Sequence, residues 1–211
     1  MKKVLILCTG NSCRSQMAHG FLQSFDKDLI VRSAGTKAAG KLNEGAVRAM
    51  AGVGIDISHH TSDPVEKYLG EEWDYVITVC GGANEACPIF TGKVKHRLHI
   101  GFDDPSHAEG TPEFIENEFR RVRDEIKNRF YEFYSTDILS NENYFPSDSS
   151  IICFCSQITV SDIKNAIANG ATNVQMVRDI LDRHQTGDCF RKNPSGKCCG
   201  SNIVAVIHKY K

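Results

Sequence analysis

A cysteine and an arginine that enclose a short loop near the N-terminus are the first residues that could do chemistry. The stretch C-T-G-N-S-C-R-S, Cys8 to Ser15, follows the apolar run V-L-I-L and has the spacing C-x5-R. A loop that leaves a strand and enters a helix can point its backbone N–H groups at a tetrahedral oxyanion, and Gly10 and Asn11 tolerate the positive φ that such a loop needs. The guanidinium of Arg14 can bind two oxygens at once. The loop therefore predicts a site for an oxyanion such as phosphate or arsenate.

Cys8 is the candidate nucleophile of this loop. We expect the N-terminus of the following helix and Arg14 to lower the pKa of its thiol, so that a thiolate lies beneath the anion. The alternative is a structural cysteine at a strand end beside an exposed arginine. Cys13 is expected to have a structural role. The residues predicted to surround the oxyanion are Thr9, Gly10, Asn11, Ser12, Cys13, Arg14 and Ser15.

A second pair of cysteines, Cys80 and Cys87, lies in V-I-T-V-C-G-G-A-N-E-A-C-P. Seven residues of helix separate two side chains by about 10 Å, whereas a disulfide needs Cα atoms within about 7 Å. The pair could therefore bond only if the segment bends, which Gly81 and Gly82 would permit; the alternative is two inert buried thiols. A phosphatase needs no thiol beyond its nucleophile, but reduction of As(V) to As(III) needs the two electrons that a thiol pair supplies. The extra cysteines favour reduction.

Four motifs in the first two thirds of the chain resemble a known family. They are C-T-G-N-S-C-R-S-Q-M-A, I-D-I-S-H-H-T-S-D, V-C-G-G-A-N-E-A-C-P and G-F-D-D-P, in this order. Together they resemble the thioredoxin-coupled arsenate reductases, which have the fold of the low-molecular-weight tyrosine phosphatases. The resemblance covers residues 2–134 and implies arsenate as substrate, thioredoxin or another thiol or electron donor as partner, and a role in arsenic resistance and detoxification.

The resemblance also implies a role for each of five residues. Cys8 attacks arsenate held by the loop and Arg14, and Asp104 protonates the departing oxygen as general acid. Cys80 then attacks Cys8 and releases arsenite. Cys87 finally attacks Cys80, and the donor reduces the resulting Cys80–Cys87 disulfide by thiol exchange.

One departure from the family concerns a monovalent cation, a possible cofactor. His19 stands where the family often carries a glutamate associated with such an ion. The remaining ligands would be Asn11, Ser33 and Asp63. The alternative for His19 is an exposed helix residue.

The second cysteine group, Cys153, Cys155, Cys189, Cys198 and Cys199, could bind a metal, because four thiolates suit either a [2Fe–2S] cluster or tetrahedral zinc. The stretch I-I-C-F-C-S-Q-I-T-V-S-D-I-K-N-A-I-A-N-G-A-T-N-V resembles the bacterioferritin-associated-ferredoxin-like [2Fe–2S] domain over residues 151–201. The ending N-P-S-G-K-C-C departs from the usual C-x2-C. This departure leaves Cys198 and Cys199 as alternatives for the fourth ligand, and zinc or no metal as alternatives to the cluster.

A cluster on the same chain suggests that it passes electrons toward the Cys80–Cys87 disulfide and partly replaces thioredoxin. A [2Fe–2S] cluster carries one electron and a disulfide needs two, so two deliveries or two chains are required. The rival role is sensing of oxidant or metal stress.

The elements that must position these residues alternate between strand and helix, which predicts an α/β fold with a four-stranded parallel sheet flanked by helices. Functional loops then follow the carboxyl ends of the strands. The predicted strands are 3–8, 29–35, 74–80 and 94–100, and the predicted helices are 14–25, 44–51 and 112–134. Residues 135–150 read as a linker without a period. Residues 151–211 read as a small helical iron–sulfur domain with helices at 161–169 and 173–184, which makes residues 1–134 the first domain.

Composition argues against two classes of function, nucleic-acid binding and membrane spanning. The chain has 211 residues and a net charge of -1, so it has no basic field for nucleic acid, and no apolar run is long enough for a membrane span. We therefore expect a cytoplasmic protein, in which nine cysteines suggest redox chemistry or metal binding.

The leading prediction is an arsenate reductase with a fused iron–sulfur module. The first alternative is a low-molecular-weight protein tyrosine phosphatase that uses Cys8, Arg14 and Asp104, although D-P-S-H lacks the aromatic pair expected there. Asp103 is the nearest rival of Asp104 as the acid, and Asp104 could also be a turn residue. The second alternative is a non-enzymatic metal or redox sensor.

Overall fold

The structure is a computed structural model of residues 1–211, and it describes all of them except 86–87, 142, 185–186 and 195. The chain divides into two compact units. The first unit comprises Met1–Ser24 and Leu29–Phe130. The second unit comprises Phe25–Asp28 and Tyr131–Lys211, so the turn after the first helix belongs with the C-terminal third of the chain.

The first unit is built on a parallel sheet of four strands in the order β2-β1-β3-β4. This confirms the prediction of a four-stranded parallel sheet. The strands are β1 (Lys3–Cys8), β2 (Ile30–Gly35), β3 (Trp73–Thr78) and β4 (Val94–His99). β3 ends two residues before Cys80, so that cysteine lies in the loop beyond the strand and not at its last position as predicted.

Burial explains the order of the strands. The run V-L-I-L-C of β1 is buried throughout, as expected for a central strand with neighbours on both sides. β4 carries Lys95, His96 and Arg97 and is largely exposed. Charged side chains are typical of an edge strand, because they discourage pairing with another chain.

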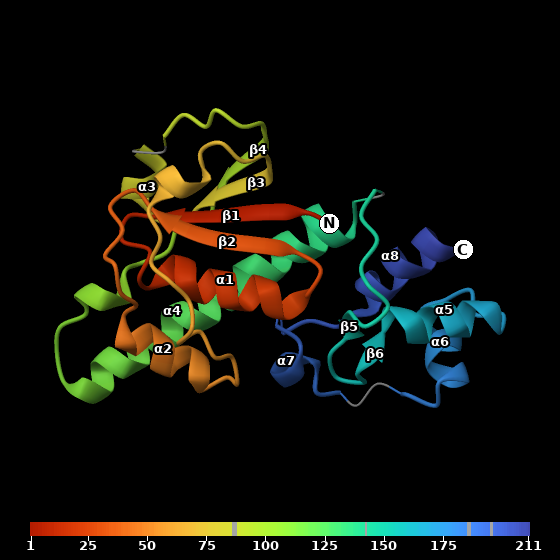
Figure 1. The fold of residues 1–211 in the computed structure, drawn as a ribbon. Helices are drawn as coiled ribbons and strands as arrows, with labels where there is room; N and C mark the ends of the chain where they lie inside the picture. The colour runs from red at the N-terminus through yellow and green to blue at the C-terminus, as the bar shows by residue number, and fades with distance from the viewer. Residues whose placement is uncertain (86–87, 142, 185–186, 195) are drawn as a thin grey trace. The chain divides into compact units, whose positions relative to one another are not determined.

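The helices of the first unit begin close to where the sequence predicts. α1 (Arg14–Phe25) runs beside β1 and β2 and begins at the end of the sheet where these strands end (Figure 1). Its apolar face, which includes Met17, Phe21 and Leu22, is buried. The other helical segments are α2 (Glu44–Ala51), η1 (Val65–Tyr68), α3 (Gly81–Glu85), η2 (Pro105–His107) and α4 (Pro112–Phe133). In the described part of the chain, no helix is long and apolar enough to cross a membrane.

The segment predicted as a linker begins with ordered structure. The six residues after α4, Tyr134–Leu139, form a π-helical turn named η3. Ile138 and Leu139 are buried, which gives the chain a reason to stay helical beyond the predicted end of α4. Further along, Tyr144 is buried and Phe145 is exposed.

A buried carboxylate organises this part of the second unit. Asp26 is 1% exposed and accepts hydrogen bonds from the hydroxyls of Tyr134 (3.0 Å) and Tyr144 (2.6 Å). Because a buried carboxylate is costly without donors, these two tyrosines stabilise the segment around it.

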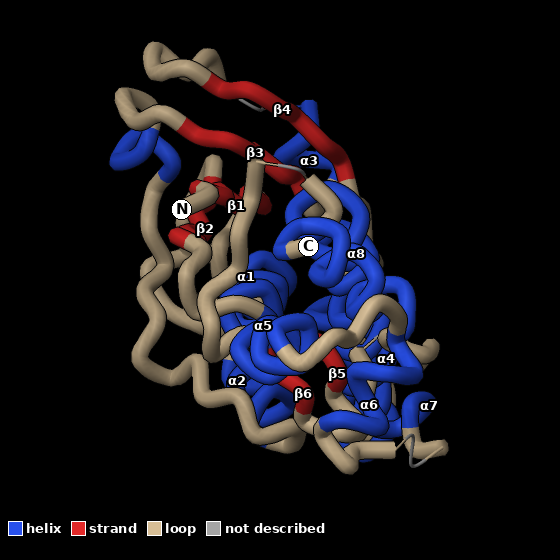
Figure 2. The backbone as a smooth tube through the Cα atoms, turned by 90° about the vertical axis from the view of Figure 1, so that its right-hand side faces the viewer, coloured by secondary structure: helices blue, strands red, loops and turns tan. Residues whose placement is uncertain are grey.

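The rest of the second unit is a small helical assembly with one hairpin (Figure 2). Its elements are β5 (Ile151–Cys153), β6 (Ile158–Thr159), α5 (Val160–Ala168), α6 (Val174–Ile180), α7 (Cys189–Lys192) and α8 (Gly200–Tyr210). α5 begins with a capping box between Thr159 and Asp162, slightly earlier than the predicted helix start at Ser161. α6 ends four residues before the predicted His184, because Asp182 adopts a φ of 50°.

Candidate active site

Cys8 ends the central strand and lies inside the loop that follows it. The residue is 3% exposed, and its Sγ receives the backbone N–H of Asn11 at 3.0 Å. The Oγ of Ser15 lies 2.9 Å from the same sulfur. The predicted loop around a thiol is therefore present, with donors already directed at the sulfur.

Asn11 is the residue that shapes the loop. It has a φ of 47°, whereas Gly10, the other residue expected to permit a positive φ, does not use one. The Asn11 side chain is fully buried, and its Nδ2 donates to Ser15 Oγ at 3.0 Å. Its Oδ1 accepts the backbone N–H of Asp63 at 2.9 Å. Asparagine suits this position because its short polar side chain tolerates the left-handed region and satisfies nearby groups.

Burial has the largest effect on the pKa of Cys8 and raises it. The hydrogen bonds from Ser15 and Asn11 act in the opposite direction, and the nearby Cys80 adds a smaller upward effect. The prediction of a lowered pKa for Cys8 is therefore wrong for this arrangement.

Arg14 is instead bound to the segment that carries the candidate acid. Its Nη1 donates to the carbonyl oxygen of Phe102 at 3.1 Å, and its Nη2 is paired with Oδ2 of Asp104. The other carboxylate oxygen of Asp104 accepts the backbone N–H of Ser106 at 3.1 Å and caps η2. Asp104 thus lies at the loop and also forms a turn.

Asp103, the alternative general acid, contacts a different arginine. Its side chain is 77% exposed and pairs with Arg121 at 3.1 Å. Of the two neighbouring carboxylates, only Asp104 contacts Arg14, so the structure favours Asp104 as the residue that can act at the oxyanion loop.

Cys80 lies beside the same loop because β1 and β3 are parallel neighbours. Leu7 pairs with Thr78, so the segments that follow the two strands leave the sheet side by side. Cys80 is 4% exposed, and its Sγ lies 3.4 Å from Oγ1 of Thr9. The structure therefore brings together Cys8 and Cys80. Cys87, the third predicted thiol, lies outside the described residues.

Cys13 is buried at the start of α1. Burial raises the pKa of its thiol, and the negative charge of Asp104 acts in the same direction. A thiol in this condition stays protonated at neutral pH, which agrees with the structural role expected for it.

The H-H-T-S-D motif supplies support that the sequence alone did not assign. Ser62 Oγ donates to the carbonyl oxygen of Gly10 at 3.1 Å, and Gln16 Nε2 donates to the carbonyl oxygen of Thr61 at 2.9 Å. In the sequence, the only sign of this support is the motif itself, a polar run between apolar segments. Its contacts with the oxyanion loop are between residues about fifty positions apart, so no local pattern revealed them.

His19 and His60 form a stacked pair beside this motif, with ring centroids 4.4 Å apart. Burial, with the positive charges of His60 and Arg32, lowers the pKa of His19 to about 3. Its Nδ1 lies 3.2 Å from Ser33 Oγ. His19 is therefore a neutral, largely buried residue, and not the exposed helix residue of the alternative.

In the second unit, several thiols lie close to one another. Cys153 Sγ is 3.5 Å from Cys155 Sγ, which is 3.7 Å from Cys189 Sγ. Cys199 hydrogen-bonds to Cys153, whereas Cys198 is exposed. These are contacts between pairs: among the residues with described positions, no group of three or more His, Cys, Asp or Glu side chains has the arrangement of a metal site.

Polar side chains also lie next to this cysteine group. Asn193 Nδ2 donates to Cys199 Sγ at 2.9 Å. The guanidinium of Arg178, a residue only 8% exposed, lies 3.8 Å from Cys198 Sγ.

Comparison with known proteins places residues 3–143 in a family. The model of the family described as low molecular weight phosphotyrosine protein phosphatase matches residues 3–143. Arsenate reductases of Halalkalibacterium halodurans and Bacillus subtilis are 50% and 51% identical to this chain over 136 residues, which are 64% of this chain and 96% of each relative. The second cysteine group lies beyond the matched residues of the family model.

Solved structures agree with this placement. An arsenate reductase described in its phosphate-binding state is 34% identical to this chain, with a TM-score of 0.54 over 63% of this chain and 96% of that one. A tyrosine phosphatase of Erwinia amylovora has a TM-score of 0.52 but 16% identity, which shows a shared fold alone. The chain therefore belongs to the low molecular weight phosphotyrosine protein phosphatase family and, within it, to the arsenate reductases.

Proposed function

We propose that this protein reduces arsenate to arsenite by a relay of thiols that runs from Cys8 to Cys80 and then to Cys87. The observation that carries the proposal is the position of Cys80, a buried thiol at the rim of the loop that holds Cys8. A phosphatase of the same fold has no use for a second thiol there. The names of the relatives at about half identity point the same way.

The proposed chemistry balances with two thiols. The Cys8 thiolate bonds to arsenic, and one arsenate oxygen leaves as water. The Cys80 thiolate then attacks Cys8 Sγ: a sulfur–sulfur bond forms, the sulfur–arsenic bond breaks, and arsenic keeps the electron pair as As(III). In sum, one arsenate and two thiols give one arsenite, one disulfide and one water. Attack of Cys87 on Cys80 moves the disulfide onward to an external donor such as thioredoxin.

Arg14 and Asp104 have complementary parts in this proposal. Arsenate in the loop would compete with Asp104 for the Arg14 guanidinium, since both offer oxygens to the same donors. Transfer of Arg14 to the substrate leaves the Asp104 carboxyl to protonate the departing oxygen.

Thr9 has a part in the second step. Its Oγ1 lies 3.4 Å from Cys80 Sγ, and a hydroxyl at that distance can donate to a thiolate and hold it near Cys8. Thr9 is a positioning residue in this scheme, because it acts through Cys80 and not on arsenate.

A single-turnover measurement tests the relay. The protein is reduced, freed of excess thiol under anaerobic conditions and mixed with arsenate. We expect about one arsenite per chain, with Cys80 and Cys87 joined in a disulfide that peptide mass spectrometry identifies. The matched variants are Cys80→Ser, which should bind arsenate and release no arsenite, and Cys198→Ser, which should behave as the unchanged protein. Hydrolysis of an aryl phosphate without arsenite would instead identify a phosphatase.

We further propose that the second unit binds a [2Fe–2S] cluster through Cys153, Cys155, Cys189 and Cys199. Two thiolates on one tetrahedral metal with bonds of about 2.3 Å lie about 3.8 Å apart. The sulfur–sulfur distances of 3.5 and 3.7 Å are close to that value, which supports a shared metal. Because Cys155 lies at this distance from both of the other thiols, the spacing suits a single tetrahedral zinc ion as well as a cluster. Cys199 is favoured over Cys198 because it is buried and bonded to Cys153, while Cys198 is exposed.

Such a group supplies single electrons when bound. Its proposed role is delivery of electrons to the disulfide left by the relay, in two successive steps. Iron and sulfide analysis of protein purified anaerobically, with its visible spectrum, tests the cluster; zinc without iron supports the alternative metal. Cys199→Ser should lose the metal and Cys198→Ser should keep it. If Cys153→Ser leaves turnover without thioredoxin unchanged, the electron-supply role is wrong.

A further inference from the structure

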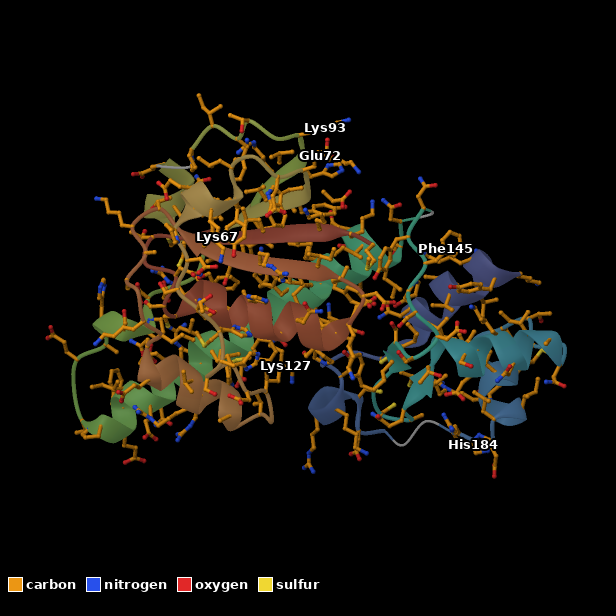
Figure 3. All side chains as sticks on the ribbon, in the orientation of Figure 1. Lys67, Glu72, Lys93, Lys127, Phe145 and His184 are labelled. Atoms are coloured by element: carbon orange, nitrogen blue, oxygen red, sulfur yellow. The ribbon has the colours of Figure 1, made fainter. Side chains whose placement is uncertain are left out.

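We propose that Lys67 takes the place of a metal cation beside the oxyanion loop, so that this enzyme works without a bound monovalent cation. The inference concerns the same loop and rests on the reductase function proposed above. Lys67 would be a positioning residue for that function, because it acts through Asp63 and Asn11 and touches no reacting atom. Figure 3 shows Lys67 near the carboxyl end of β2.

The oxygens that a cation would need are already bonded within the chain. Asn11 Oδ1 accepts the backbone N–H of Asp63 at 2.9 Å, and Ser33 Oγ is paired with His19. Oδ2 of Asp63 accepts the Lys67 ammonium at 2.8 Å and the hydroxyl of Tyr68 at 2.5 Å. The three side chains named as remaining cation ligands thus have partners in the described structure, and the Lys67 ammonium already occupies the carboxylate oxygen of Asp63 that a cation would need.

The charges of the surrounding pocket also disfavour a metal cation. Asp63 is the one carboxylate among the described residues that line it, and Arg32 and Lys67 supply two fixed positive charges. A metal ion at Asp63 would displace the Lys67 ammonium or lie against it. His19, which occupies the place of a carboxylate ligand, adds no negative charge.

A continuous set of hydrogen bonds connects Lys67 with the nucleophile. The carboxylate of Asp63, which is 16% exposed, is held by Lys67, and the backbone N–H of Asp63 donates to Asn11 Oδ1. Asn11 in turn donates its backbone N–H to Cys8 Sγ and its Nδ2 to Ser15 Oγ. Lys67 therefore stabilises the left-handed conformation on which the donors around Cys8 depend.

The test compares potassium chloride with tetramethylammonium chloride at constant ionic strength. Three quantities are measured: the thermal unfolding midpoint, the rate of alkylation of Cys8 by iodoacetamide, and kcat/KM for arsenate. The first two do not require arsenate reduction, so failure of the proposed function and failure of this inference are distinguishable. Wild-type protein should change by less than about twofold in either rate between the two salts.

Variants make the test specific. The double variant His19→Glu with Lys67→Met restores a carboxylate and removes the ammonium, and potassium should raise its midpoint by about 2–4 °C. Lys67→Met alone should slow alkylation, and Lys67→Arg should restore the rate. The control is Lys93→Met, at an exposed lysine of the same unit. The proposal is overturned if wild-type protein responds to potassium as strongly as the double variant, or if Lys67→Met alters none of the three quantities.

Discussion

The two cysteine groups of this chain differ in what surrounds each sulfur. In the first unit, Cys8 is contacted by donors, a backbone N–H and a hydroxyl, and the neighbouring Cys80 is contacted by a hydroxyl. In the second unit, Cys153 and Cys155 contact one another as well as other thiols. Donors stabilise an individual thiolate for attack, whereas sulfurs in mutual contact suit a shared ligand.

The number of cysteines alone therefore says little about the reactivity of each thiol. Burial raises the pKa of both Cys8 and Cys13, but at Cys8 the hydrogen bonds from Ser15 and Asn11 act against that rise. The local donors, and not the degree of burial, distinguish the proposed nucleophile from Cys13.

The largest expected effect separates the roles of the two cysteine groups. Cys8→Ser should lower arsenite formation by about 10⁴-fold or more, because no other thiol in the described part of the chain has the loop's donors. Cys153→Ser should leave the single-turnover yield within about twofold, since that step needs only the first group. The amount of arsenite, measured by chromatography after one turnover, distinguishes the two variants. Equal loss in both variants would show that the two groups act as one site.

The next effect tests the role of Asp104 at the loop. Asp104→Asn should slow the arsenate step by about 10²–10⁴-fold, because the amide cannot deliver a proton. The rate of Cys8 alkylation, which needs no acid, should fall much less. Asp103→Asn is the matched control and should have little effect, since that side chain is exposed and paired with Arg121. Equal slowing by the two changes would remove Asp104 from the proposed chemistry.

Much of the first unit could be predicted because its signals are local. The strand before Cys8 and the helix from Arg14 follow from apolar periodicity and from the loop motif. The pairing of Arg14 with Asp104 joins residues ninety positions apart, and no nearby pattern encodes it. The predicted pKa of Cys8 is wrong because burial of the thiol, which depends on the whole fold of the first unit, outweighs the donors of the loop.

The second unit is less predictable from its sequence. Helix α8 has an apolar face that includes Ile203, Val206 and Ile207, but its start in a Gly- and Cys-rich stretch concealed it. The choice between Cys198 and Cys199 could not be made from adjacent positions in the sequence. Burial and contact with Cys153 distinguish them in three dimensions.

A smaller effect concerns pH and sharpens the contrast between Cys8 and an ordinary thiol. Because burial raises the pKa of Cys8 above its ordinary value, its thiolate fraction should keep growing as pH rises past about 9, and so should its alkylation rate. The protonated thiol is favoured in the folded protein, so this group's contribution to the free energy of unfolding is present below that pH and is lost above it. Ser15→Ala should slow alkylation at about pH 7 several-fold, because one donor is gone. A rate that levels off near neutral pH would show that the loop lowers the pKa instead.

The smallest effect concerns Thr9, the contact between the loop and the second thiol. Thr9→Val keeps the shape of the side chain and removes the hydroxyl that lies 3.4 Å from Cys80 Sγ. One hydrogen bond is worth about 0.5–1.5 kcal/mol, so release of arsenite should slow by about 2- to 12-fold while Cys8 alkylation is unchanged. Thr9→Ser keeps the hydroxyl and should retain most of the rate. If both steps slow together in Thr9→Val, the hydroxyl supports the whole loop and not Cys80 in particular, and the donors of the first unit would then form one network rather than one set for each thiol.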